Sequence, residues 1–262
     1  NAMIATNQMS KNTALAGSSM EKLSTGLRIT KAGDDAAGLA VSEKMRAQIR
    51  GMEQAGRNVQ DGISLVQTAE GALEEAGNIV QRMRELGIQA GNDTLATTDR
   101  EKIKSELEQL QKEMGDISAE TKFNGNALLD GTKATFTIQA GANKETRKID
   151  MENLSNIAKT LSAIDVASAK AAQTFVEKVD TALEKITKAR ANLGAMQNRL
   201  EATSSNLSTS TENLTAAESR IRDVDVAKEM VKLSKLNILT QASQAMVSQA
   251  KQQPEQVTQL LR

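Results

Sequence analysis

The residues best suited to chemistry in this chain are two pairs of carboxylates, Asp34 with Asp35 and Asp223 with Asp225. Neighbouring carboxylates can bind a divalent cation or act as general acid and base. The chain contains no His and no Cys, so it offers no Cys or His metal site, no Ser-His-Asp or Cys-His nucleophile and no disulfide. Both pairs fall in short connectors, where carboxylates commonly cap the following helix. We therefore expect capping residues and predict neither an enzyme nor a metal or cofactor site.

The longest helix that these connectors must join runs from Phe175 to Val224. Apolar or small residues recur in it at alternating steps of four and three, the 3.5-residue period of a helix packed along another helix. At 1.5 Å per residue it is about 75 Å long, which predicts an elongated bundle. The seam positions are Phe175, Val179, Ala182, Ile186, Ala189, Leu193, Met196, Leu200, Thr203, Leu207, Ser210, Leu214, Ala217, Ile221 and Val224.

A second long helix, from about Ala36 to Ala90, supplies the partner. The same alternation runs from Met45 to Val66 and, after one slip, resumes from Ala69 to Met83, which indicates a local change of supercoil. Several glycines lie within this helix, and each costs about 1 kcal/mol relative to Ala. Packing against neighbouring helices must therefore stabilise it.

The middle of the chain changes from a helical to a strand period. A shorter helix is expected from a capping box at Thr98 and Glu101 to about Ile117. Phe136 and Ile138 then alternate with polar residues before a turn at residues 141–144, which predicts a β-hairpin.

Amphipathic helices are expected at both ends, with no partner in the three-helix core, and Pro254 stops or kinks the last one. The predicted fold class is mainly α: an elongated antiparallel long-helix bundle with a small β-hairpin region and amphipathic terminal helices. We divide the chain into an N-terminal helix with its connector, the N-terminal core helices, the hairpin region, the C-terminal long helix and the C-terminal helix. These segments are residues 1–35, 36–132, 133–165, 166–222 and 223–262.

Charge and composition exclude several classes of partner. The 33 basic residues balance 33 acidic ones, so neither nucleic acid nor an anionic membrane surface is indicated. No apolar run approaches the ~18 residues of a membrane span, and no signal peptide opens the chain.

Several long motifs resemble the bacterial flagellin family. The front half carries MEKLSTGLRITKAGDDAAGLAVSEKMRAQIRG from Met20 to Gly51, and then NVQDGISLVQTAEGALEE, QRMRELGIQA and TKFNGNALLDG. The back half carries NLTAAESRIRDVDVAKEM from Asn213 to Met230 and ends in QASQAMVSQAKQQPEQVTQLLR. Together these motifs cover both ends and most of the chain.

The resemblance implies a structural subunit that polymerises into the bacterial flagellar filament for motility, with paired end helices lining an inner tube. It implies secretion through a dedicated export channel and an extracellular location. The implied partners are other copies of the chain, a flagellar export chaperone and the vertebrate innate receptor for flagellin. A short hairpin region in place of a larger outer domain implies a thin filament. Family members usually begin some ten residues earlier, so a truncated N-terminus is expected after the cloning remnant Asn1-Ala2-Met3.

Contacts for polymerisation and for the chaperone are expected on the last helix. Its apolar side chains have no partner in the core, and a helix alone is marginal without burial, so residues 4–32 and 226–262 are expected to depend on a partner for order. The candidate residues are Met230, Leu233, Ile238, Leu239, Met246, Leu260 and Leu261.

Receptor binding is a second expectation from the resemblance. The segment from Gln81 to Leu86 is similar to the flagellin segment that the receptor binds, and Glu113 falls at the matching acidic position on the third helix. Arg82 and Leu86 are four residues apart and so share a helical face, where a guanidinium beside an apolar side chain would form an interface anchor. From the residues alone, the alternative is that Arg82 is solvated and Leu86 belongs to the core.

Two other classes of protein share part of this pattern. A hook–filament junction protein shares the end motifs, although its middle and ends are usually more divergent. A cytoplasmic signalling coiled coil would also show heptads, but it would have no β-hairpin between unequal helices and would need a membrane span.

Overall fold

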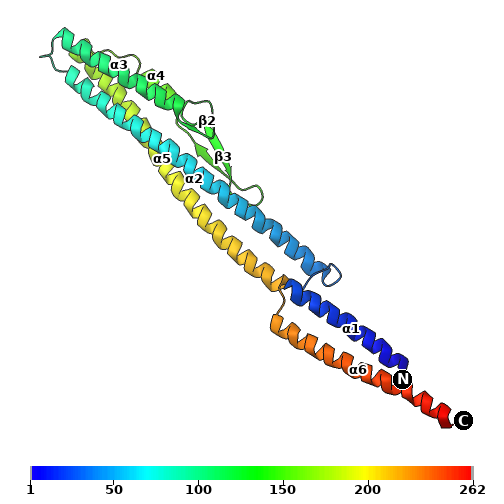
Figure 1. Cartoon of the computed structure of the whole chain (residues 1–262). Helices are drawn as coiled ribbons and strands as arrows, with labels where there is room; N and C mark the ends of the chain where they lie inside the picture. Colours follow the sequence, from blue (N-terminus) through cyan, green and yellow to red (C-terminus); the bar gives the residue numbers. More distant parts are fainter. Residues whose placement is uncertain (1, 261–262) are drawn as a thin grey trace. The chain divides into compact units, whose positions relative to one another are not determined.

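Helices dominate the computed structural model of the chain (Figure 1). The structure describes the backbone of residues 2–260 and the side chains of residues 3–250. In chain order the described elements are α1 (Ala2–Thr25), α2 (Ala36–Ala90), α3 (Thr97–Glu120), β1 (Lys122–Phe123), β2 (Asn126–Ala127), β3 (Thr135–Gln139), β4 (Thr146–Asp150), α4 (Leu154–Thr160), α5 (Ala169–Arg222) and α6 (Val226–Leu260). The prediction of a mainly α chain with a small β-hairpin region is confirmed.

Two compact units divide the chain. The first combines residues up to Ile49 with residues from Glu212 onward, and it contains α1, α6 and the connectors beside them. The second, Arg50–Thr211, contains α3, α4 and both hairpins. Helices α2 and α5 contribute to both units, and the five-segment division remains a prediction.

In the second unit α2 and α5 pack antiparallel. Arg190 donates a hydrogen bond to Glu70 at 2.7 Å, and Arg84, further along α2, donates to Asp180, earlier in α5, at 2.6 Å. Most of the predicted seam residues of this unit are buried, which confirms the alternating period, while Met52, Gly56, Met196, Thr203, Leu207 and Ser210 are only partly buried. The buried seam residues are Val59, Ile63, Val66, Ala69, Leu73, Ala76, Val80 and Met83 on α2, and Phe175, Val179, Ala182, Ile186, Ala189, Leu193 and Leu200 on α5.

The close approach of these helices depends on Gly87. A Cβ at this position would lie 2.7 Å from Cγ2 of Val176, closer than two carbon atoms can pack. The glycine therefore allows α5 to pack closely against α2. This packing offsets the free-energy cost of a glycine within a helix.

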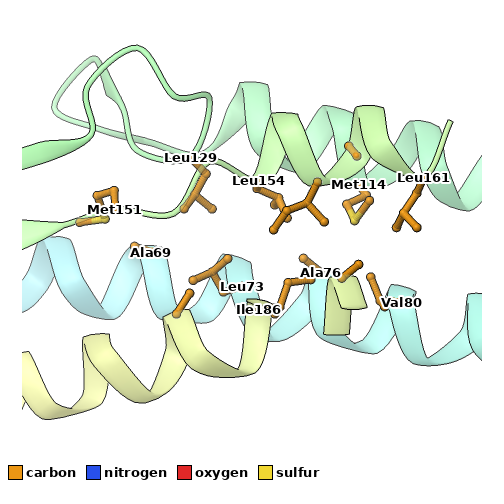
Figure 2. Close-up of a cluster of buried hydrophobic side chains, with 14 of the residues drawn as sticks. Ala69, Leu73, Ala76, Val80, Met114, Leu129, Met151, Leu154, Leu161 and Ile186 are labelled. Carbon is orange, nitrogen blue, oxygen red and sulfur yellow. The ribbon is translucent and has the colours of Figure 1, made fainter. Parts of the chain in front are cut away.

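A further layer of the same core comes from α3 and α4. Figure 2 shows Met114 of α3, Leu154 of α4 and the nearby Leu161 facing Leu73 and Val80 of α2, and all five side chains are fully buried. The cluster is almost entirely aliphatic, as the scarcity of aromatic residues requires. The short helix α4 was not predicted, because seven residues are too few to reveal a period.

The hairpin forms where the period of two indicated it. Phe136 of β3 pairs with Ile149 of β4, and both side chains are buried in the core of the second unit. Asn124 and Gly125 join β1 to β2 with positive φ angles of 49° and 79°, as a two-residue type I′ turn requires.

Two expectations about helix ends need correction. The capping box at Thr98 and Glu101 is wrong: α3 begins at Thr97, so Thr98 lies inside the first turn, and the N-cap residue Ala96 makes no side-chain cap. Of the two alternatives for Pro254, a stop is wrong, because α6 continues to Leu260, while a kink stays a prediction. A proline removes one backbone donor, which a helix can survive.

In the first unit α1 and α6 pack along each other. Leu233 and Leu236 of α6 are buried in this contact, but so are the polar side chains of Asn12 and Ser19 of α1. The terminal helices therefore find a partner in each other, through a seam that is only partly apolar.

Candidate functional site

The first acidic pair is engaged in local structure. Oδ1 of Asp35 accepts a hydrogen bond from the backbone N–H of Gly38 at 2.8 Å and so caps α2. Oδ2 of Asp34 accepts from the N–H and hydroxyl of Thr30 at 3.1 and 2.9 Å and from the N–H of Lys31 at 3.2 Å. The hydrogen bonds from Thr30 lower the pKa of Asp34.

The second acidic pair is engaged in the same way. Asp225 accepts from the N–H of Lys228 at 3.1 Å and caps α6, while Asp223 accepts a short hydrogen bond from the hydroxyl of Ser219. Across the described part of the chain, no three or more Asp or Glu side chains are grouped so that they could hold a metal ion. Asp35 and Asp225 therefore cap the helices that follow them, as expected from the sequence, whereas Asp34 accepts hydrogen bonds within its connector and Asp223 accepts one from the end of α5.

The predicted polymerisation and chaperone residues of α6 divide into two groups. Met230, Ile238, Leu239 and Met246 are exposed, with Ile238 62% and Met246 67% accessible. Leu233 is instead buried at the contact with α1, and Ile238 lies nearly opposite to it around the helix. The side chain of Leu260 is among those that the structure does not describe, and Leu261 lies outside the described residues.

Helix α6 is therefore apolar on two sides. Leu233 and Leu236 face α1, while Val231 and Ile238, one heptad apart, lie on the other side and are 72% and 62% accessible. Apolar side chains that remain exposed on a second side of a helix commonly mark a contact with another chain.

Helix α1 carries exposed apolar side chains that the sequence-based list omitted. Leu15 and Met20 are both more than half accessible, as are Met3 and Ile4 near the start of the helix. The sequence pattern could have indicated this exposure. Asn12 and Ser19 are a heptad apart and share one face of the helix, and Leu15 does not lie on that face.

The predicted receptor-binding residues lie in the second unit, where they separate by exposure. Gln81 and Arg82 are exposed on α2, and Glu113 is exposed on α3. Leu86 is only 2% accessible and belongs to the core. The expectation that Arg82 and Leu86 share an exposed face is wrong, because the buried stripe of α2 continues from Met83 to Leu86, as the core alternative supposed.

The acidic residue beside Arg82 is Glu106. Nη2 of Arg82 donates to Oε1 of Glu106 at 2.9 Å, and Nη1 donates to Oε2 of Glu85 at 3.0 Å. The hydrogen bonds to Glu85 and Glu106 raise the pKa of Arg82. Glu113 lies about two turns further along α3, or about 10 Å away along its axis. The sequence could not identify Glu106, since that requires the register of α3 against α2.

No described helix combines the length and the apolar character that crossing a membrane requires. The fold and its surfaces define a class of protein, a helical subunit with capped connectors. Its terminal helix α6 would be fully buried only in contact with other chains.

Comparison with known proteins identifies the family. A model of the bacterial flagellin N-terminal helical region matches residues 1–134, and one of the C-terminal helical region matches residues 176–261. A flagellin of Halalkalibacterium halodurans is 53% identical, covering 100% of this chain and 97% of its own, and one of Bacillus subtilis is 48% identical, covering 98% and 96%. The crystal structure of Bacillus cereus flagellin is 34% identical with a TM-score of 0.54, covering 62% of this chain and 94% of its own.

The chain belongs to the bacterial flagellin family. It is a structural subunit of the flagellar filament, which is extracellular, and it is not an enzyme. The family implies polymerisation with other flagellin subunits, and neither the junction protein nor the signalling coiled coil is favoured.

Proposed function

We propose that the side of α6 facing away from α1 is the surface through which this subunit contacts its neighbours in the filament. The observation that supports this proposal is the exposure of Val231, Ile238 and Leu239, which line one shallow hollow on a helix whose other side is already covered. Fully burying one such side chain contributes about 1.5–3 kcal/mol. Several of them, repeated in every subunit, favour assembly over the free monomer.

The test compares two aspartate substitutions one residue apart. Ile238→Asp places a charge on the proposed surface, whereas Asn237→Asp places the same charge at a neighbouring exposed polar position. We expect Ile238→Asp to raise the critical concentration for filament formation about tenfold or more, measured by sedimentation and electron microscopy. Asn237→Asp serves as the matched control, and equal assembly of the two variants would refute the proposal.

Before secretion, the same surface is proposed to bind a flagellar export chaperone, over a region from Met230 to Leu261. The support is chemical, since exposed aliphatic side chains such as Ile238 and Leu239 invite aggregation while the monomer is in the cell. A purified export chaperone is expected to slow amide exchange in α6 and to bind Ile238→Asp more weakly than Asn237→Asp. Unchanged exchange in α6 on addition of the chaperone would remove this partner.

A second proposed function is recognition by the vertebrate innate receptor for flagellin, through Gln81, Arg82 and Glu106. The support is a solvent-exposed guanidinium oriented by two carboxylates, a common form of interface anchor. The buried Leu86 is left out, and Glu113 is retained only as the competing acidic residue.

Receptor-reporter cells treated with monomeric protein test this assignment. Arg82→Ala is expected to reduce signalling about tenfold or more, as hot-spot residues do. Glu106→Gln is expected to reduce signalling further than Glu113→Gln, because Glu106 accepts a hydrogen bond from Arg82 and Glu113 does not. Full signalling by Arg82→Ala would exclude this surface, and the reverse order of the two Glu variants would restore Glu113.

A further inference from the structure

The two connectors of the first unit are joined by backbone hydrogen bonds. The N–H of Arg28 donates to the carbonyl of Arg222 at 2.7 Å, and the N–H of Val224 donates to the carbonyl of Gly26 at 3.0 Å. These bonds form an isolated antiparallel bridge centred on Leu27 and Asp223. We call residues 26–28 and 221–224 the connector clasp.

Side chains and one special backbone conformation reinforce the clasp. Nη2 of Arg28 donates to the carbonyl of Ile221 at 2.7 Å, and Nη1 of Arg222 donates to Glu43 of α2 at the same distance. Gly26 has a φ of +72°, in the left-handed region that favours glycine. The connection from α1 into the clasp therefore requires that conformation at Gly26.

Helices α1 and α6 keep one register from the clasp outward. Next to it, the buried Ser19 of α1 is near Glu229 of α6, whose pKa is lowered by the Ser19 hydroxyl. Two heptads further along each helix, Ala5 and Ser243 line the same groove. Both helices advance by two heptads between these two places, which fits an antiparallel pairing without a slip.

The seam between the two helices discriminates weakly between registers. The buried Asn12 accepts a hydrogen bond from Gln8 of its own helix, at 3.4 Å, and a shift of one heptad would place it opposite the equally polar Ser243. Small residues such as Ala5 and Ala16 fit opposite many side chains. The information that fixes the register must therefore come from outside the seam.

We propose that the connector clasp sets the register of α1 against α6, with Arg28 and Gly26 as its positioning residues. The clasp holds the end of α1 and the start of α6 at one fixed offset, and the helices extend from there. That offset determines which apolar side chains of α6 remain uncovered by α1. Its effect on filament assembly rests on the proposed assembly surface, whereas the register itself does not.

Cysteine cross-linking measures the register directly, because the natural chain contains no Cys. Ala5→Cys with Ser243→Cys reports the register of the structure, and Asn12→Cys with Ser243→Cys reports a shift of one heptad. In the otherwise unchanged chain, disulfide formation at the first pair is expected to dominate, since the bond forms only between closely placed Cα atoms.

Clasp variants are then compared in both reporters. Arg28→Gln and Gly26→Val are each expected to lower the ratio of native to shifted cross-link at least threefold. Arg220→Gln, which removes an exposed arginine at the same end of α5, is the matched control and should leave the ratio unchanged. Circular dichroism confirms that each variant keeps its helices.

An unchanged cross-link ratio in both clasp variants would overturn the proposal. A lower thermal midpoint with an unchanged ratio would also overturn it, because the clasp would then stabilise the helices without setting their register. Sedimentation is measured separately. A shifted register with normal filament formation would instead count against the assembly surface on α6 and leave the assignment of the clasp intact.

Discussion

The two antiparallel helix pairs of this subunit differ in the kind of side chain that they bury. In the second unit α2 and α5 bury Leu73, Val80 and Phe175 and expose charged side chains. In the first unit α1 and α6 bury Asn12 and Ser19 beside two leucines and expose large aliphatic residues. The first arrangement is stable within one chain. In the second arrangement, large apolar side chains stay exposed within one chain, and their burial can stabilise the helices only through contact with other chains.

Amide exchange gives the largest contrast between the pairs. We expect slow exchange from Met45 to Val80 and fast exchange in residues 4–32 and 226–250 of the monomer, with rates differing about a thousandfold. The reason is that local opening free energies range from near zero to the global stability. Hydrogen exchange with mass spectrometry measures this, and equal protection throughout the chain would break the comparison.

Leu200→Ala tests the apolar seam itself. Leu200 is fully buried on α5, so we expect the substitution to lower the free energy of unfolding by about 2–5 kcal/mol, measured by urea denaturation. Leu207→Ala, at a partly buried seam position of the same helix, serves as the control and is expected to have a smaller effect. If Leu200→Ala leaves the unfolding midpoint unchanged, the seam does not carry the stability assigned to it.

Asn12→Leu tests the polar seam in the opposite direction. An apolar side chain at this buried position is expected to stabilise the α1/α6 pair by about 1 kcal/mol, roughly the value of one or two buried methylene groups. Slower exchange in α6 of the monomer is the readout. Asn7→Leu, at an exposed position of the same helix, is expected to leave exchange unchanged. A destabilised Asn12→Leu pair would show that the polar seam is optimal as it stands.

The smallest effect concerns pH. The hydroxyl of Ser19 and the ammonium group of Lys232 lower the pKa of Glu229 below its usual 4.5. The ionised carboxylate therefore stabilises the α1/α6 pair above that pH, and this contribution is lost as the pH falls through the lowered pKa. Helicity followed by circular dichroism is expected to decline less in acid for Glu229→Gln than for the unchanged chain. Glu212→Gln, at an exposed position, should titrate like the unchanged chain.

Features that follow from the regular spacing of apolar residues could be predicted from the sequence. The alternation of four and three placed Val80 and Leu193 in the seam because a 3.5-residue period has one structural meaning over such a length. The hairpin followed from a period of two at Phe136, and capping by Asp35 from its place before a helix.

Features that depend on how separate elements meet could not be predicted. Glu106 is paired with Arg82 only through the register of α3 against α2. Arg100 is buried although it reads as a surface residue, and it donates to the carbonyls of Ala90 and Asn92 at the end of α2. No local pattern marks an arginine that caps another helix.

The polar seam of α1 and α6 has a thermodynamic consequence. Apolar burial gives unfolding its positive heat-capacity change, so a pair that buries Asn12, Ser19 and Ser243 melts with a small heat-capacity change over a broad range of temperature. The larger apolar surface of α6 is covered only when chains associate. For the exposed apolar surface of α6, unlike the apolar core of the second unit, the heat-capacity change of apolar burial is therefore expected on association. That association is expected to strengthen when the solution is warmed from the cold.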